Sequence, residues 1–146
     1  MKIETHGGFY ISQIKQLSSR IFEKLLKDND IEEFNGPQGR ILFVLWQKEN
    51  LSISELGEKT SLAKTTLTSM LDRMADQGHI QRNPDSKDRR QIRITLTEKA
   101  KSLKNSYDAV TIQMNELFYE GFSDEEITRF DNMLAKVLNN LKQYKE

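Results

Sequence analysis

The sequence contains no cysteine and only two histidines, His6 and His79. Without cysteine, the chain cannot form a disulfide bond, sense an oxidant through a thiol or bind a metal through thiolates. The two histidines lie far apart in the sequence, so they do not suggest a shared metal site. We therefore expect a protein that uses no metal ion and no other cofactor.

Long apolar runs are also missing. The N-terminus lacks the stretch of about 7 to 15 apolar residues that is typical of a signal peptide. No segment approaches the ~20 consecutive apolar residues that a helix needs to cross a bilayer. We expect a cytoplasmic protein that makes no contact with a membrane.

The chain has no excess of charge of either sign, because 22 Lys and Arg residues balance 22 Asp and Glu residues among its 146 residues. The balance is uneven along the chain, however. Residues 61–95 carry seven Lys or Arg and only four Asp, and no Glu. A local basic field on a neutral body indicates an anionic partner better than the total charge does.

Apolar spacings of three and four predict a helix at each end of the chain. The first is predicted to follow Gly7 and Gly8 and to close at residues 28–30. Two long helices are predicted at the C-terminal end, over residues 96–117 and, after a capping box at Ser123 and Glu126, over residues 124–144. The apolar stripes of these two helices recur every 3.5 residues on average, which is typical of long packed helices. The members of the three stripes are Tyr10, Ile14, Leu17, Ile21 and Leu25; Leu96, Ala100, Leu103, Tyr107, Val110, Met114 and Leu117; and Ile127, Phe130, Leu134, Val137, Leu141 and Tyr144.

The middle of the chain predicts a compact group of shorter elements. The turn at residues 35–37 places a proline at the start of a helix whose residues 41–46 are apolar almost all round, so we expect it to be buried. Ser52 and Glu55 form a second capping box ahead of a short helix over residues 53–59. We expect Ser61 to cap a further helix over residues 63–77, which Gly78 ends.

These two helices, joined by about three residues, have the arrangement of a helix-turn-helix. The apolar residues that such packing needs are Ile53, Leu56, Leu62, Leu67 and Met70, and Gly57 is expected where the helices touch. From residue 80 the apolar period changes to two. This change predicts a hairpin with strands at residues 79–82 and 91–96 and a turn at residues 83–88.

The second helix of the pair begins with an unusual set of polar residues. Three threonines are poor helix formers, but hydroxyl groups donate and accept hydrogen bonds and suit base edges and phosphates. The N-terminus of a helix also attracts phosphate. The alternative is that these residues only cap and solvate the helix. The set comprises Lys64, Thr65, Thr66, Thr68 and Ser69.

The hairpin turn supplies a cluster of cations directly after this helix: Lys87, Arg89, Arg90 and Arg93. Such a hairpin can place an arginine in a DNA minor groove beside a helix that occupies the major groove. Asp88 suits this role as a partner that holds the Arg90 guanidinium in a fixed direction. The alternative is a charged turn that is merely solvated.

Residues 62–100 resemble the MarR family of bacterial transcription regulators. The resemblance rests on the Leu-Asp-Arg turn at residues 71–73, on Gly78, on the D-x-R element formed by Asp88 and Arg90, and on Leu-Thr-Glu at residues 96–98. It implies a mainly α-helical winged helix-turn-helix with a small β-hairpin wing, assembled as a homodimer. The helix over residues 63–77 would enter the major groove and Arg90 the minor groove.

Two departures from the family pattern are visible. Ala100 stands where the family often has glycine, and we expect no functional consequence. The absence of cysteine excludes the branch that senses peroxides through a thiol. Over the whole chain, the resemblance predicts a single MarR-type unit, with dimerisation helices at residues 1–34 and 97–146 and a DNA-binding lobe at residues 35–96.

The sequence thus predicts a dimeric, sequence-specific DNA-binding repressor that recognises an inverted repeat. A small aromatic or lipophilic effector is expected to relieve repression by binding near Tyr10, Trp46 and Tyr107; the alternative is that these aromatic residues are only core residues. The alternatives are a DNA-binding regulator or architectural factor without a ligand switch, and a protein–protein module. An enzyme is not expected, because no Gly-rich phosphate loop, metal cluster or nucleophile–base pair is present. The expected DNA-contacting residues are Ser61, Lys64, Thr65, Thr66, Thr68, Ser69, Arg73, Lys87, Asp88, Arg89 and Arg90.

Overall fold

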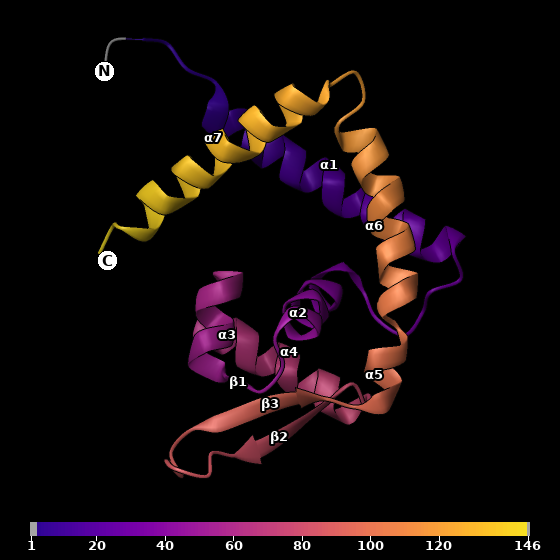
Figure 1. The fold of residues 1–146 in the computed structure, drawn as a ribbon, viewed down its shortest axis with the longest axis vertical. Helices are drawn as coiled ribbons and strands as arrows, with labels where there is room; N and C mark the ends of the chain where they lie inside the picture. The colour runs from indigo at the N-terminus through magenta and orange to yellow at the C-terminus, as the bar shows by residue number, and fades with distance from the viewer. Residues whose placement is uncertain (1–2, 146) are drawn as a thin grey trace.

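The computed structural model describes residues 3–145, which form seven helices and three strands in the described part of the chain (Figure 1). The predicted fold class, mainly α-helical with a small β-hairpin wing, is confirmed. The elements are α1 (Gly7–Asp28), α2 (Gly36–Gln47), β1 (Leu51–Ser52), α3 (Ile53–Thr60), α4 (Lys64–Asp76), β2 (Ile80–Pro84), β3 (Ile92–Leu96), α5 (Glu98–Ser102), α6 (Lys104–Phe118) and α7 (Asp124–Lys142).

Reciprocal capping boxes start three of the helices. The two predicted boxes, at Ser52 for α3 and Ser123 for α7, are confirmed. A third box, in which Asn35 pairs with Gln38, starts α2 and was not predicted. Each box satisfies two backbone N–H groups that a helix start leaves free.

Two predictions about helix ends are wrong. Ser61 does not cap α4; it closes α3 in the left-handed conformation, with φ of 59°. The turn of three residues between α3 and α4 uses this position to reverse the chain, and Ala63 precedes α4 without a side-chain cap. Gly7 and Gly8 do not precede α1 but form its first turn. Gly78 ends α4 as predicted, with φ of 81°.

The sheet has three antiparallel strands in the order β1-β3-β2. Leu51 of β1 pairs with Ile94 of β3, and Ile80 of β2 pairs with Leu96. β1 was not predicted, because two residues are too short to show a period. β2 extends to Pro84, which pairs with Ile92, so the predicted turn over residues 83–88 is displaced toward Gln91. We call β2, β3 and their connection the wing, and residues 85–91 its tip.

The long helix predicted over residues 96–117 is divided into α5 and α6 at Leu103. Thr97 caps α5 by accepting a hydrogen bond from the Ala100 N–H. Leu103 keeps φ of −84° and ψ of −6°, close to helical values, so the apolar spacing continues through the break. Periodicity alone therefore could not reveal the division.

Most of the core lies within residues 35–96, which we call the lobe, and side chains of α1 and α6 such as Leu26 and Val110 complete it. The helix-turn-helix packs as predicted: Leu56 and Leu67 are fully buried, and a Cβ on Gly57 would lie 3.6 Å from Leu67 Cδ2. α2 is buried less completely than predicted, because the Phe43 side chain is 41% exposed. The fully buried large side chains are Leu26, Ile41, Leu42, Leu45, Leu51, Leu56, Leu67, Leu71, Met74, His79, Ile94 and Val110.

α7 projects away from the lobe as an arm, which crosses the N-terminal half of α1 in the view of Figure 1. None of its described residues is buried. The bend between α6 and α7, which we call the elbow, contains Gly121 with φ of 84° and a cluster of four aromatic rings. These rings belong to Phe118, Tyr119, Phe122 and Phe130. No helix in the part of the chain that the structure describes is long and apolar enough to cross a membrane.

Candidate nucleic-acid interface

α4 lies on the lobe with a narrow buried stripe and a broad exposed face. Leu67, Leu71 and Met74, spaced by four and three, are its buried residues. Every polar residue predicted to contact DNA on this helix is exposed, namely Lys64, Thr65, Thr66, Thr68, Ser69 and Arg73. The described residues supply none of these four hydroxyl groups with a hydrogen-bond partner. The whole set is therefore available to a ligand from solvent.

The first turn of α4 is also uncapped. Ala63, at its N-cap, offers no side-chain acceptor, and Ser61 is exposed in the turn that precedes it. The free N–H groups of an uncapped helix start, together with the helix dipole, form a favourable position for an anion. Ser61 thus lies beside the helix start without serving as its cap.

The tip of the wing is organised by two aspartates. The Asp85 N–H donates to the Gln91 carbonyl at 3.0 Å, and the Lys87 N–H donates to the Asp85 carboxylate at 2.8 Å. The bond from the Lys87 backbone, followed by the bond from Arg93, lowers the pKa of Asp85 below its usual value. The Gln91 N–H closes a second loop by donating to the Asp88 carbonyl at 3.0 Å. The cations of the tip therefore lie on a turn that hydrogen bonds hold in one conformation.

Asp88 and Arg90 are paired in the way that the sequence predicts. The Arg90 backbone N–H and its Nε both donate to Asp88 Oδ1, at 3.0 and 3.2 Å. The Arg90 side chain is nevertheless 91% exposed. The guanidinium is therefore held at its base and projects into solvent. The pairing is present, whereas the role of these residues in DNA binding stays a prediction.

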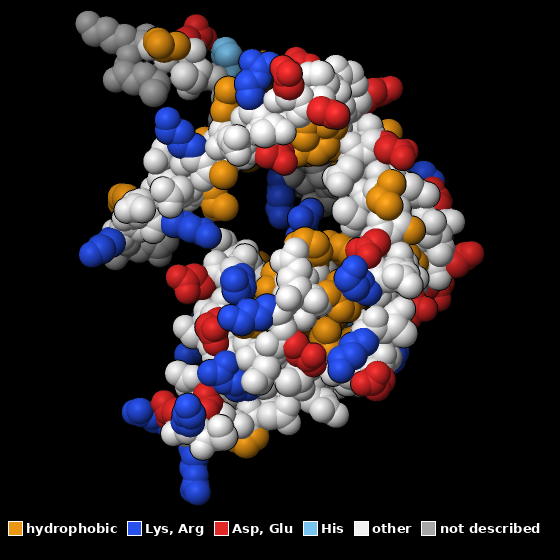
Figure 2. All heavy atoms as spheres, viewed as in Figure 1, with side chains coloured by type: hydrophobic (Ala, Val, Ile, Leu, Met, Phe, Trp, Pro, Cys, Tyr) orange, Lys and Arg blue, Asp and Glu red, His pale blue; other side chains and the backbone are white. Residues whose placement is uncertain are grey.

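Arg93 behaves differently from the other cations of the cluster. Its Nε donates to Asp85 Oδ2 at 3.0 Å, and its Nη1 donates to the Asn50 carbonyl at 2.9 Å and to Glu55 Oε1 at 3.2 Å. Alternation along β3 could not reveal this, because it shows only that the side chain is on the polar face. Arg82, on the adjacent strand, pairs with Asp72 of α4. Figure 2 shows the Lys and Arg side chains that remain exposed around the wing end of the molecule.

Comparisons with known proteins agree with this architecture. The sequence profile of the MarR family matches residues 34–92. The chain is 32% identical to the organic hydroperoxide resistance transcriptional regulator of Bacillus subtilis (strain 168), over 98% of the chain and 94% of that protein. The chain belongs to the MarR family. The family prediction is thus confirmed, and the MarR-family chain is a transcriptional regulator.

Two further comparisons define how far the likeness extends. The regulator TtmR of Methylorubrum extorquens (strain PA1) is 41% identical over 78 residues, which cover 53% of the chain and 40% of that protein. A crystal structure of a mutant MarR from E. coli with operator DNA has a TM-score of 0.79 and 22% identity. It covers 90% of this chain and 92% of that one. At this level of identity, the structural likeness confirms the winged helix-turn-helix fold.

The three aromatic residues predicted to line an effector site of this MarR-family chain do not lie together within one subunit. Trp46 and Tyr107 are neighbours, with ring centroids 5.2 Å apart. Tyr107 is buried, and this burial raises the pKa of its hydroxyl. Its ring approaches Gly39 so closely that a Cβ there would lie 2.8 Å from it. Tyr10, 57% exposed, lies twelve residues before the Phe22 ring that contacts Tyr107, about 18 Å along α1.

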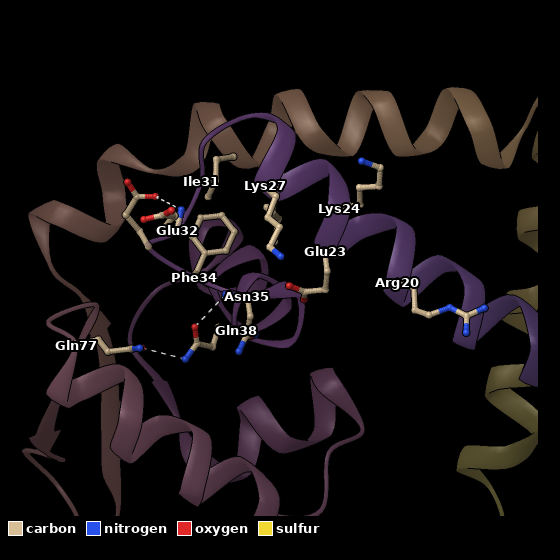
Figure 3. A pocket seen from close by; sticks show the side chains of 12 residues that line it. Arg20, Glu23, Lys24, Lys27, Ile31, Glu32, Phe34, Asn35, Gln38 and Gln77 are labelled. Carbon is tan, nitrogen blue, oxygen red and sulfur yellow. Dashed lines mark hydrogen bonds between the residues drawn. The ribbon is translucent and has the colours of Figure 1, made fainter.

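A groove with a cavity volume of about 750 Å³ lies between α1, the loop that follows it, and α2 (Figure 3). Gln38 on one wall donates through Nε2 to Gln77 Oε1 at 3.0 Å, which connects α2 to the end of α4. The Gly36 N–H donates to Glu23 of α1, which connects α1 to the start of α2. None of the three predicted aromatic residues lines this groove, so the predicted effector site stays a prediction.

Proposed function

We propose that two copies of the chain form a dimer that binds an inverted repeat in double-stranded DNA and represses transcription. One observation carries the proposal: the hydroxyl-rich face of α4 is exposed, and the wing that follows presents Arg90 on an ordered turn. A recognition helix and a wing with these properties match the two grooves of a duplex. In a two-fold dimer, the recognition helices would lie about one DNA turn, ~34 Å, apart.

The contacts divide into two kinds. Thr66 and Ser69 would read base edges in the major groove, while Lys64 and Arg73 would meet phosphates. Arg90 would enter the adjacent minor groove, where the negative potential is strongest. The remaining contacts would come from Ser61, Thr65, Thr68, Lys87, Asp88 and Arg89.

Dimerisation would be carried by α1 and by the C-terminal helices. A 19-residue helix without a buried residue has little stability of its own, so α7 requires a partner surface. Figure 2 shows an open hollow between the arm and the lobe, with hydrophobic side chains at its edges. A second copy would cover these surfaces by two-fold symmetry. The exposed apolar residues are Phe9, Tyr10, Ile11, Ile14, Leu17 and Ile21 on α1, and Met133, Val137, Leu138, Leu141 and Tyr144 on or just after α7.

This assignment gives residues 1–34 and 97–146 to dimerisation and residues 35–96 to DNA binding. The hydrogen bond that the Gly36 N–H donates to Glu23 supports a mechanical connection between the two parts, and the bond that Gln38 donates to Gln77 extends it to the end of α4. A small aromatic or lipophilic effector would relieve repression by favouring a spacing of the recognition helices that does not fit DNA. It acts only if it binds one spacing better than the other.

We further infer that the chain is not an enzyme, because its curated relatives are transcriptional regulators. The second candidate is a DNA-binding regulator or architectural factor without a ligand switch. Thermal-shift screening with phenolic acids separates the two. Stabilisation by one ligand class, together with release of DNA, supports the switch. If no ligand class stabilises the protein, the factor without a switch is favoured.

The central experiment selects bound duplexes from a random pool with the purified full chain, and measures its mass by sedimentation. An inverted repeat and a dimeric mass are expected. A monomer at micromolar concentration that binds no duplex at low salt would overturn the proposal.

Substitutions on α4 test its role directly. Thr66→Ala should change the sequence preference at one position, by about 1–3 kcal/mol, because it removes a base contact. Lys64→Ala should lower affinity for all duplexes and reduce the salt dependence, because it removes a phosphate contact. Titrations of selected and random duplexes distinguish these effects. Equal losses on both duplexes for Thr66→Ala would show that Thr66 only positions the helix.

A further inference from the structure

Arg93 connects three segments that are distant in the sequence. Its guanidinium bonds Asp85 at the start of the wing tip, Glu55 in the first turn of α3, and the Asn50 carbonyl before β1. The side chain is only 30% exposed, and that of its partner Asp85 is 10% exposed. A planar guanidinium suits such a junction because its donors point in several fixed directions.

The partners of Arg93 are themselves fixed. Glu55 accepts a hydrogen bond from the Ser52 N–H in the capping box of α3, and this bond, with the Ser52 hydroxyl, lowers the pKa of Glu55. Ser52 also pairs in register with Arg93 across β1 and β3. Asp85 accepts from the Lys87 N–H inside the tip. A continuous set of charged hydrogen bonds therefore runs from the start of α3 to the turn that holds the cations.

The tip has few other connections to the lobe. The hydrogen bonds made by residues 85–91 stay within the tip, apart from the one that Arg93 makes to Asp85. Pro84 and Ile92, the last ladder pair before the tip, are both exposed. The direction in which the tip points thus depends on the strand ladder and on Arg93.

We propose that Arg93 is a positioning residue for DNA recognition: it fixes the wing against α3 so that Arg90 reaches the minor groove. This inference rests on the proposed function, because it assigns Arg93 a role in the same interface. The Arg90 side chain is exposed and bonds only Asp88 beside it, whereas Arg93 uses its Nε and Nη1 for partners within the subunit. The cation cluster of the wing therefore contains one residue that directs the tip and others that contact DNA.

A double-mutant cycle on the selected duplex tests the inference. Arg93→Met keeps the aliphatic length and removes the fork, and it should weaken binding about tenfold, as should Arg90→Ala. In the Arg90→Ala background, Arg93→Met should weaken binding less than about twofold, because the contact that Arg93 positions is already absent. Arg93→Lys should behave like Arg93→Met, since one ammonium cannot hold three partners in the geometry of a fork.

Arg89→Met is the matched control on the same tip. It also removes one cation, and it should weaken binding by a similar factor in the wild-type and Arg90→Ala backgrounds, as independent contacts do. Amide exchange supplies a second readout without DNA: the Lys87 and Gln91 N–H groups should exchange faster in Arg93→Met, while those of α4 remain protected.

Should Arg93→Met fail to fold, Glu55→Gln replaces it. This variant keeps an acceptor for the Ser52 N–H but removes the charge that faces Arg93. It should lose less affinity for the selected duplex than Arg93→Met does, and this loss should also disappear in the Arg90→Ala background. If Arg93→Met or Glu55→Gln lost the same factor of affinity in the wild-type and Arg90→Ala backgrounds, the inference would be overturned. The proposed function fails separately, when the wild-type chain itself binds no duplex.

Discussion

The lobe and the arm differ in how completely one chain buries their apolar residues. In the lobe, Leu56, Leu67 and Ile94 are fully buried, and their helices and strands cover one another. In the arm, Leu141 is 68% exposed and Val137 is 42% exposed, although their stripe is just as regular. The same apolar spacing therefore has two different outcomes. It indicates that a surface must be covered, but not whether the covering surface belongs to the same chain.

The largest expected effect concerns the arm and tests whether a second copy of the chain covers its apolar face. Leu138→Asp would place two like carboxylates in the interface of a dimer, and each uncompensated buried charge costs roughly 3–5 kcal/mol. Sedimentation should show dissociation to monomers at concentrations at which the wild type is dimeric. Asn139→Asp, at the adjacent and also exposed position of α7, is the matched control and should remain dimeric. An unchanged dimer in Leu138→Asp would show that this face of α7 is not covered.

The next prediction compares the same substitution, leucine to alanine, at a buried position of the lobe and at an exposed position of the arm. Leu67→Ala opens a cavity in the lobe, and it should lower the free energy of unfolding by about 2–5 kcal/mol at any protein concentration. Leu141→Ala should cost under about 0.5 kcal/mol in a monomer, as surface changes do, but more in a dimer. Thermal unfolding at several concentrations distinguishes the two cases. If Leu141→Ala lowered the free energy of unfolding equally at all protein concentrations, the surface that covers Leu141 would belong to the same chain.

A smaller effect concerns the exposed surface of the lobe. Arg90→Ala should weaken binding to the selected duplex by about 1–3 kcal/mol. Asp88→Ala should weaken it as well, although it removes a negative charge, because the Arg90 guanidinium loses the acceptor that directs it. Titrations at two salt concentrations measure both variants. Tighter binding by Asp88→Ala would mean that Asp88 acts only through its charge.

The smallest effect lies at the elbow, between the two regions. The Tyr119 hydroxyl donates to Asp131, and this bond raises the pKa of Tyr119 to about 12. Because the pKa is raised on folding, the stabilisation is complete below pH ~10, where an unfolded tyrosine begins to ionise, and is lost as the pH rises toward 12. Ultraviolet titration should show a late-ionising tyrosine, besides the buried Tyr107, that is absent in Tyr119→Phe. Identical titration curves would show that the bond does not persist in solution.

Much of the fold could be predicted because it depends on local signals. The capping boxes at Ser52 and Ser123, the left-handed Gly78 and the change of period at residue 80 each depend on a few neighbouring residues. The predictions failed where longer-range geometry decided the outcome. Ser61 closes α3 in the left-handed conformation where the chain reverses into α4, and β1 exists only because β3 lies beside it.

The candidate interface shows the same division. The sequence predicted the polar face of α4 and the pairing of Asp88 with Arg90, which lie on one helix and in one turn. It counted Arg93 with the other cations, because charge is visible in a sequence and the direction of a side chain is not. The distant partner Glu55 and the carbonyl of Asn50 became its neighbours only through folding.

The sequence by itself determined the family, the hairpin and most of the helices, and it predicts which residues would meet a duplex. Tertiary structure alone decided which of the wing arginines is free, how α1 connects to α2 and α4, and that the stripe of α7 finds no cover within the described chain. The physical reason is the separation along the sequence of the residues that interact. Helix starts, turns and periodic faces depend on neighbours in the sequence, whereas burial and the direction of a charged side chain depend on segments that only the folded chain brings together.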